Sequence, residues 1–108
     1  MTDISVAHAE AIRRYEIHVD DAIAGFAEYL DSDDRRIFFH TEIGEEYGGQ
    51  GLGSTLIQEA VVDTIRSGKR IVPICSFVAK YLEKNPAYSE HVAEVTQEDR
   101  DLVADAAP

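Results

Sequence analysis

The stretch "EIGEEYGGQGLGSTLIQEA", Glu42–Ala60, decides how this 108-residue sequence is interpreted. It begins in residues that suit a strand, passes through a glycine-rich turn and ends in residues that suit a helix. Glycine lets a backbone turn sharply and lets other groups approach it closely. The first N–H groups of a helix have no partner within the helix and lie at the positive end of its dipole. A strand, a glycine turn and a helix in this order therefore form a candidate anion-binding site.

Two phosphate-binding patterns with glycine-rich turns do not fit this stretch. The dinucleotide-binding pattern Gly-x-Gly-x-x-Gly fails on its third glycine, because the sixth residue counted from Gly49 is Ser54. The P-loop ends in Gly-Lys-Ser/Thr, whereas Gly53 is followed by Ser54 and Thr55. A glycine-rich turn that binds nothing remains the simple alternative, since glycine clusters mark turns of every kind.

The residues before the turn predict three strands. Tyr15, Ile17 and Val19 alternate with polar residues, Ala22–Leu30 is largely apolar, and Arg35–Ile43 forms a third run. Acidic turns separate them, which is typical of an antiparallel meander. Strict alternation in the third strand places one set of side chains on one face (Ile37, Phe39, Thr41, Ile43) and a second set on the other (Phe38, His40, Glu42).

The residues after the turn predict a helix, a strand and a second helix. Leu52, Leu56, Ile57, Ala60, Val61 and Ile65 recur at helical spacing up to a stop at Ser67-Gly68. Arg70–Cys75 then suits a strand, and a helix follows up to Asn85-Pro86. A helix joins the third and fourth strands, so these are expected to be parallel neighbours. The prediction is an α+β fold with a mixed sheet, a flexible segment over residues 1–12, and an acidic tail over residues 94–108 that forms a short helix or is disordered.

Composition narrows the classes of function. The net charge is −11, which disfavours binding to nucleic acids and to anionic membranes. Cys75 is the single cysteine, so an internal disulfide is excluded. No run of about 18 apolar residues, no signal peptide and no metal-ligand spacing is evident. We therefore expect a soluble, cytoplasmic protein that is a monomer or a weak homodimer.

The segment "HTEIGEEYGGQGLGSTLIQEA", His40–Ala60, resembles motif A of the GNAT N-acetyltransferases, whose pattern is Arg/Gln-x-x-Gly-x-Gly/Ala. Gly51-Leu52-Gly53 matches its last three positions, and Gly48 stands where the family has Arg or Gln. "RIVPICSFVAKYLEKNPAY", Arg70–Tyr88, resembles the short single-domain (YjdJ-type) branch, in which a strand ends in cysteine and an aromatic helix follows. The resemblance covers about residues 13–92, and it implies a minimal GNAT-like domain over residues 13–93.

In this family the cofactor is acetyl-CoA, and the resemblance implies where each of its parts binds. Its pyrophosphate is expected on the amides of the glycine turn, and its pantetheine arm along the edge of the third strand. The cofactor-binding candidates are Thr41, Ile43, Gly48, Gly49, Gln50, Gly51, Leu52, Gly53 and Ser54. Cys75, His40 and Glu42 are the candidate catalytic residues: a thiol before a helix N-terminus, and two possible general bases.

The resulting hypothesis is an acetyl-CoA-dependent N-acetyltransferase with an unknown amine acceptor. Ordinary family members have extra helices after the first strand and extra strands at the end, and these are missing here. A CoA-binding or interaction module without transferase activity is therefore the main alternative. A cysteine hydrolase that uses Cys75 and a histidine is a weaker one, because no order of residues suggests a triad.

Overall fold

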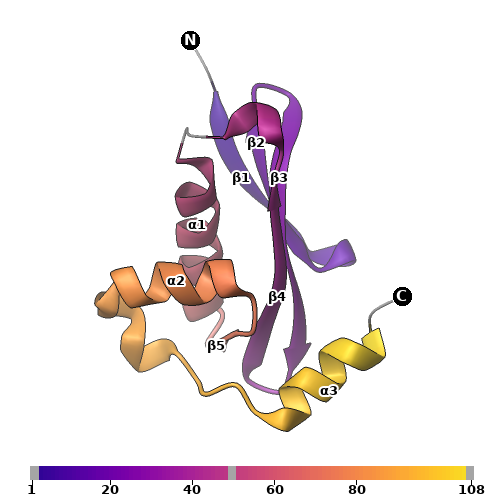
Figure 1. The fold of residues 1–108 in the computed structure, drawn as a ribbon, viewed down its shortest axis with the longest axis vertical. Coiled ribbons are helices and arrows are strands. Elements are labelled where there is room, and N and C mark those ends of the chain that lie inside the picture. Colours follow the sequence, from indigo (N-terminus) through magenta and orange to yellow (C-terminus); the bar gives the residue numbers. More distant parts are fainter. Residues whose placement is uncertain (1–2, 49–50, 107–108) are drawn as a thin grey trace.

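The computed structural model describes residues 3–48 and 51–106. In that part of the chain, five strands form one sheet with helices packed against it (Figure 1). The strands are β1 (Ile4–Ala9), β2 (Arg14–Val19), β3 (Ala22–Ser32), β4 (Arg35–Ile43) and β5 (Arg70–Pro73). The α-helices are α1 (Leu52–Arg66), α2 (Ser76–Lys84) and α3 (Gln97–Ala106), and short 3-10 helices cover Glu10–Ile12, Glu45–Tyr47 and Pro86–His91.

The sheet has the predicted mixed topology. Its order is β1-β2-β3-β4-β5, with antiparallel pairing from β1 to β4 and parallel pairing between β4 and β5. The predicted meander and the parallel pair joined by a helix are both confirmed. β5 ends at Pro73, two residues before the expected end at Cys75, and Phe38 of β4 lies opposite this proline.

The prediction of a flexible N-terminal segment was wrong for the described residues. Ile4–Ala9 forms β1, which pairs along its whole length with β2. The sequence does carry the signal, because Ile4 and Val6 alternate with Ser5 and Ala7 as in a half-buried strand. The run is short, and pairing with β2 supplies the stability that local propensity lacks.

Strict alternation along β4 was also a wrong prediction, because the strand contains a β-bulge. Glu28 of β3 lies opposite His40, but the next residue, Tyr29, lies opposite Phe38, so Phe39 is an extra residue. Phe38 consequently packs among the side chains that face α1, whereas Ile37 packs on the opposite face with Val72.

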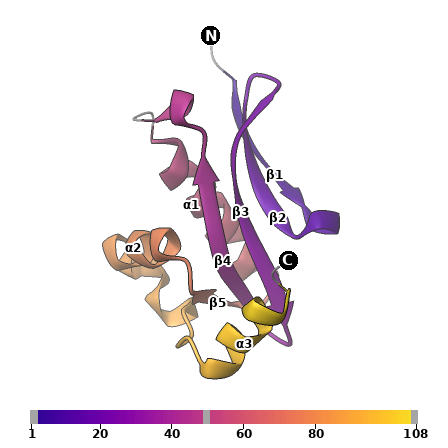
Figure 2. The ribbon, with the colours of Figure 1, turned by 45° about the vertical axis from the view of Figure 1, so that its right-hand side comes forward.

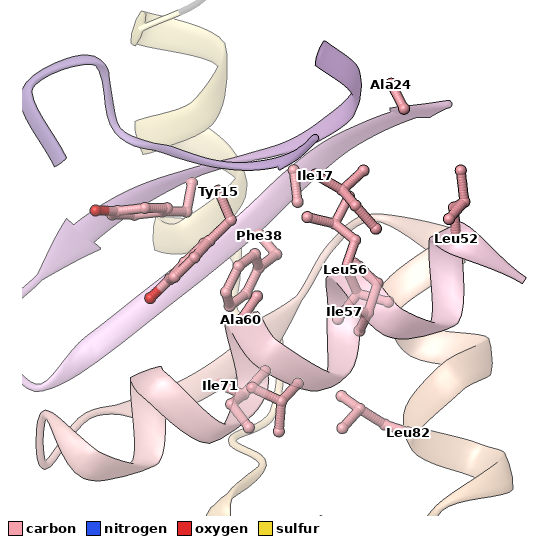
Figure 3. Close-up of a cluster of buried hydrophobic side chains, with 14 residues drawn as sticks. Tyr15, Ile17, Ala24, Phe38, Leu52, Leu56, Ile57, Ala60, Ile71 and Leu82 are labelled. Atoms are coloured by element: carbon pink, nitrogen blue, oxygen red, sulfur yellow. The ribbon is translucent and has the colours of Figure 1, made fainter. Parts of the chain in front are cut away.

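The main core lies between the sheet and α1 (Figure 3). The helical spacing read from the sequence gives the buried face of α1: Leu52, Leu56, Ile57, Ala60 and Val61. These residues pack against the strands and against Val78 and Leu82 of α2. Each fully buried aliphatic side chain stabilises the fold by about 1.5–3 kcal/mol. We call the side of the sheet that faces α1 and α2 the helix face, and the other side the open face.

Helix α3 covers only part of the open face (Figure 2). Leu102 and Val103 pack against the cluster of Ile37 and Val72. Asp99, which is only 2% exposed, accepts a 2.6 Å hydrogen bond from Nη2 of Arg35 in β4. The acidic tail thus contains a helix attached to the sheet, the first of its two expected states. None of the helices in the described ranges is long and apolar enough to cross a bilayer.

Candidate functional site

The glycine-rich turn leads from the end of β4 to the first turn of α1. The chain leaves β4 through Gly44, whose N–H donates to the carbonyl of Ala24, and then forms the 3-10 helix Glu45–Tyr47 (Figure 1). Gly49 and Gln50, both predicted to bind the cofactor, lie outside the described residues. The first α-helical bond of α1 runs from Thr55 N–H to the carbonyl of Gly51. The amides of Leu52, Gly53 and Ser54 therefore have no acceptor within the helix.

Gly51 and Gly53 are required for different reasons. Gly51 is the N-cap of α1 with φ 71°, a left-handed conformation that residues with a Cβ adopt at a cost. A Cβ placed on Gly51 would meet no atom of residues 3–48 or 53–106 within 4 Å, so on the side of those residues the space above it is open. A Cβ on Gly53 would lie 2.3 Å from Cζ of Phe77. Gly53 therefore allows the first turn of α2 to pack closely on α1.

Beyond Phe38, β4 continues without β5 beside it. The last backbone contact between this edge and the segment after β5 is the 2.9 Å hydrogen bond from Cys75 N–H to the carbonyl of Phe38. Cys75 is the N-cap of α2, and its Sγ lies 3.4 Å from Oγ1 of Thr41. Because residues alternate along a strand, Thr41 and Ile43 share the helix face, and Ile43 packs against the main core. The structure thus brings the predicted residues Cys75, Thr41 and Ile43 to one side of the sheet.

His40 and Glu42 lie on the open face instead. Nε2 of His40 is 3.4 Å from Oε1 of Glu42, and their side chains are 47% and 60% exposed. The His40 ring also lies 6.0 Å from the ring of Phe26. The two candidate bases therefore form a solvated pair with each other, and no bond joins them to Cys75 among the contacts of the described residues.

A pocket of about 420 Å³ lies between α1 and α2. It extends from the N-terminal half of α1 along α2 and is lined by Ser54, Thr55, Gln58, Phe77, Lys80, Tyr81, Lys84 and Asn85. Its wall is held in place, because Nδ2 of Asn85 donates to the carbonyl of Tyr81 and the Tyr81 ring stacks on Tyr88. Burial raises the pKa of Tyr81, so this phenol is neutral near pH 7.

Of these pocket residues, only Ser54 is among the predicted cofactor-binding residues. Phe77 and Tyr81 fit the apolar spacing of a core helix, although Phe77 is 42% exposed. Lys80 and Lys84 stand four residues apart, a spacing that is equally common on a solvated helix face. One feature of the sequence could have identified these α2 residues: they directly follow Cys75 and the strand that was expected to pair in parallel with the third strand.

A second depression, of about 650 Å³, lies at the ends of β3 and β4. Thr41, Glu42 and Ile43 line it, together with Phe26 and Glu45 among others. It therefore includes residues from both faces of β4 at the end of the strand. Three of the residues predicted for the site meet in this depression.

Comparison with known proteins identifies the family. The sequence model of the GCN5-related N-acetyl-transferase family matches residues 14–92, which include β2 to β5, α1, α2 and the glycine-rich turn. The chain matches none of the curated proteins with which it was compared. The family match agrees with the strand–turn–helix geometry, and the chain belongs to the GCN5-related N-acetyltransferases, a family of acetyl-transferring enzymes.

Proposed function

We propose that this protein transfers the acetyl group of acetyl-CoA to an amine. The observation that carries the proposal is the edge of β4 that continues past β5. This edge begins beside Cys75 and passes Thr41 and Ile43, and α1, whose first amides have no acceptor within the helix, begins nine residues after Ile43. An extended pantetheine arm would lie along such an edge with its thioester near Cys75.

The diphosphate of the cofactor would bind at the N-terminus of α1. The amides of Leu52, Gly53 and Ser54 provide donors, and the helix dipole favours an anion there. The described residues leave the space above Gly51 open, which gives room for a phosphate to approach the backbone. No acidic side chain lies in the first turn of α1, so no carboxylate of that turn competes for these donors.

The nucleotide end would occupy the pocket between α1 and α2, which begins at Ser54. Lys80 and Lys84 line it, and within the described residues neither lies within 4.0 Å of a carboxylate oxygen. In a chain of net charge −11, two lysines without such a partner provide local attraction for a polyanion. The exposed ring of Phe77 offers a surface on which an adenine base could stack.

The chemistry follows from these positions. The nitrogen of a neutral amine would attack the thioester carbonyl, so that a C–N bond forms, the C–S bond breaks, and CoA leaves as the thiolate or thiol. The amine loses one proton, and Glu42 or His40 would accept it, directly or through a water molecule. Cys75 would either donate a proton to the leaving sulfur or accept the acetyl group first and pass it to the amine.

Release of free CoA from acetyl-CoA in the presence of a panel of small amines and lysine peptides tests this function. The proposal predicts turnover with at least one amine, and loss of affinity for acetyl-CoA in Lys80→Ala/Lys84→Ala. Lys69→Ala is the matched control, because Lys69 donates to the carbonyl of Asp33, away from the pocket. Absence of acetyl-CoA binding in the intact protein would refute the proposal.

The same assay separates the enzyme from a binding module. If CoA and acetyl-CoA bind equally and no amine is acetylated, the protein is a CoA-binding module. Mass spectrometry after incubation with acetyl-CoA alone distinguishes the two roles of Cys75. An acetylated Cys75 peptide indicates a covalent step, and an unmodified peptide with normal turnover indicates direct attack by the amine.

A further inference from the structure

The pocket between α1 and α2 is lined by charge of one sign. Lys80 and Lys84 are the charged side chains among its described lining residues, and the remaining side chains are polar or aromatic. The neighbouring acids on the two helices, Glu59 and Glu83, instead line depressions beside β1 and beside β5. Within the described residues, no carboxylate oxygen lies within 4.0 Å of either lysine, so both ammonium groups are available to an anion in this pocket.

The two lysines extend the pocket away from the helix N-terminus at which the diphosphate would bind. Gly53 in the first turn of α1 packs against Phe77 in the first turn of α2. Phe77, Lys80 and Lys84 stand three and four residues apart, so they share one face of α2. At a rise of about 1.5 Å per residue, Lys84 lies about 10 Å from Phe77 along the helix axis. The pocket therefore joins two places for anions, the first amides of α1 and the lysine pair of α2.

We propose that Lys80 and Lys84 bind the 3′-phosphate of CoA, an inference that rests on the proposed function. CoA carries two anionic groups at its nucleotide end, a diphosphate and a 3′-phosphate, and the ribose separates them. With the diphosphate on the amides of α1, the 3′-phosphate would lie further along α2, toward the lysines. A phosphate monoester carries a charge of about −1.5 to −2 near pH 7, so two ammonium groups match it.

The consequence of this assignment is selection for the 3′-phosphate. In a ligand without that group, the two lysines would have no anionic partner, although the diphosphate would still bind α1. Charge-assisted hydrogen bonds from an ammonium group to a phosphate are stronger than bonds between neutral groups. We therefore expect CoA to bind at least about tenfold more tightly than 3′-dephospho-CoA at low ionic strength. Both lysines are exposed, so this preference should decrease as added salt screens the attraction.

Calorimetric titration of the intact protein with CoA and with 3′-dephospho-CoA tests the proposal without any acetyl transfer. The two ligands share the thiol, the pantetheine arm, the diphosphate and the adenosine, and they differ in one phosphate. In Lys80→Ala/Lys84→Ala we expect the affinity for CoA to fall about tenfold and the preference to disappear. Lys80→Arg/Lys84→Arg keeps both positive charges and should retain most of the preference. Lys69→Ala is the matched control for net charge and should keep the full preference, because Lys69 donates to the carbonyl of Asp33, away from the pocket.

The outcomes separate this proposal from the proposed function. A wild-type chain that binds CoA and 3′-dephospho-CoA equally would overturn the assignment of the 3′-phosphate and leave CoA binding intact. A double alanine variant that is folded, as shown by its melting curve, but loses affinity for both ligands by the same factor would also overturn it. The lysines would then contact a group that both ligands carry, such as the diphosphate. Binding of neither ligand to the wild type would refute the proposed function and this inference together.

Discussion

Replacing Gly53 with alanine tests the contact that shapes the pocket between α1 and α2. The new Cβ would lie 2.3 Å from Cζ of Phe77, whereas carbon atoms pack at about 3.5–4.0 Å. The ring must therefore move, and its 42% exposure leaves it room to turn toward solvent. Loss of this packing is expected to cost about 1 kcal/mol of stability. The helix preference of alanine over glycine offsets up to about 1 kcal/mol of it.

The net change in the free energy of unfolding is thus within about 1 kcal/mol, while the pocket wall changes. We expect the affinity for acetyl-CoA to fall about tenfold, which corresponds to about 1.4 kcal/mol. Denaturant unfolding and calorimetry on wild type, Gly53→Ala, Phe77→Ala and the double variant separate the two effects. Without the ring, Gly53→Ala should be neutral or stabilising. If Gly53→Ala has the same effect on unfolding and on affinity in both backgrounds, the reasoning is refuted.

Three further variants test other parts of the structure. Asp99→Asn should destabilise the protein by about 1–3 kcal/mol, measured by urea unfolding, because Arg35 loses a charged partner. The hydrogen bond from Arg35 lowers the pKa of Asp99 in the folded protein below its unfolded value of 3.8. This stabilisation is therefore present above about pH 4 and is lost as the pH falls through the lower, folded pKa. A wild-type free energy of unfolding that is no lower at about pH 3 than at about pH 6 would contradict this reasoning. Cys75→Ala should still fold and bind CoA, with about 1–2 kcal/mol less stability, and free-CoA release shows whether turnover needs the thiol. Gly48→Arg places a cation beside the predicted phosphate site, so calorimetry should give equal or higher CoA affinity, and a large loss would place the phosphates elsewhere.

The sequence predicted the elements with clear periodicity. The alternation around Ile17 and the helical spacing from Leu52 to Ile65 gave β2 and α1, because burial of one face leaves a regular pattern. The parallel β4–β5 pair followed from the helix between the two strands. These features depend on local residue order, which a single sequence contains.

What the sequence did not predict depends on contacts between distant residues. β1 is stable because it pairs with β2, and the bulge at Phe39 reflects the register of β4 against β3. The attachment of α3 depends on Arg35 and Asp99, 64 positions apart. In the candidate site, Gly51 and Cys75 were predicted from motifs, and their roles stay predictions, whereas the contact of Phe77 with Gly53 depends on the relative position of two helices.

The separation of Cys75 from His40 and Glu42 has one local cause and one distant cause. Alternation along β4 separates Thr41 from His40 and Glu42, as the sequence predicts, whereas the place of Cys75 beside β4 depends on how the segment after β5 packs against that strand. Thr41 joins Cys75 on the helix face, and its two neighbours face the other way. The acceptor amine would therefore reach the candidate bases from the open face.

The most direct test of the central claim is an NMR titration of the ¹⁵N-labelled protein with acetyl-CoA. The proposed binding mode predicts saturable shifts of the amide signals of Leu52, Gly53 and Ser54, together with Thr41 and Ile43 on the free edge of β4. Amides of β1 serve as the internal control and should not move. Absence of shifts at millimolar acetyl-CoA, or shifts confined to residues away from α1 and β4, would contradict the account.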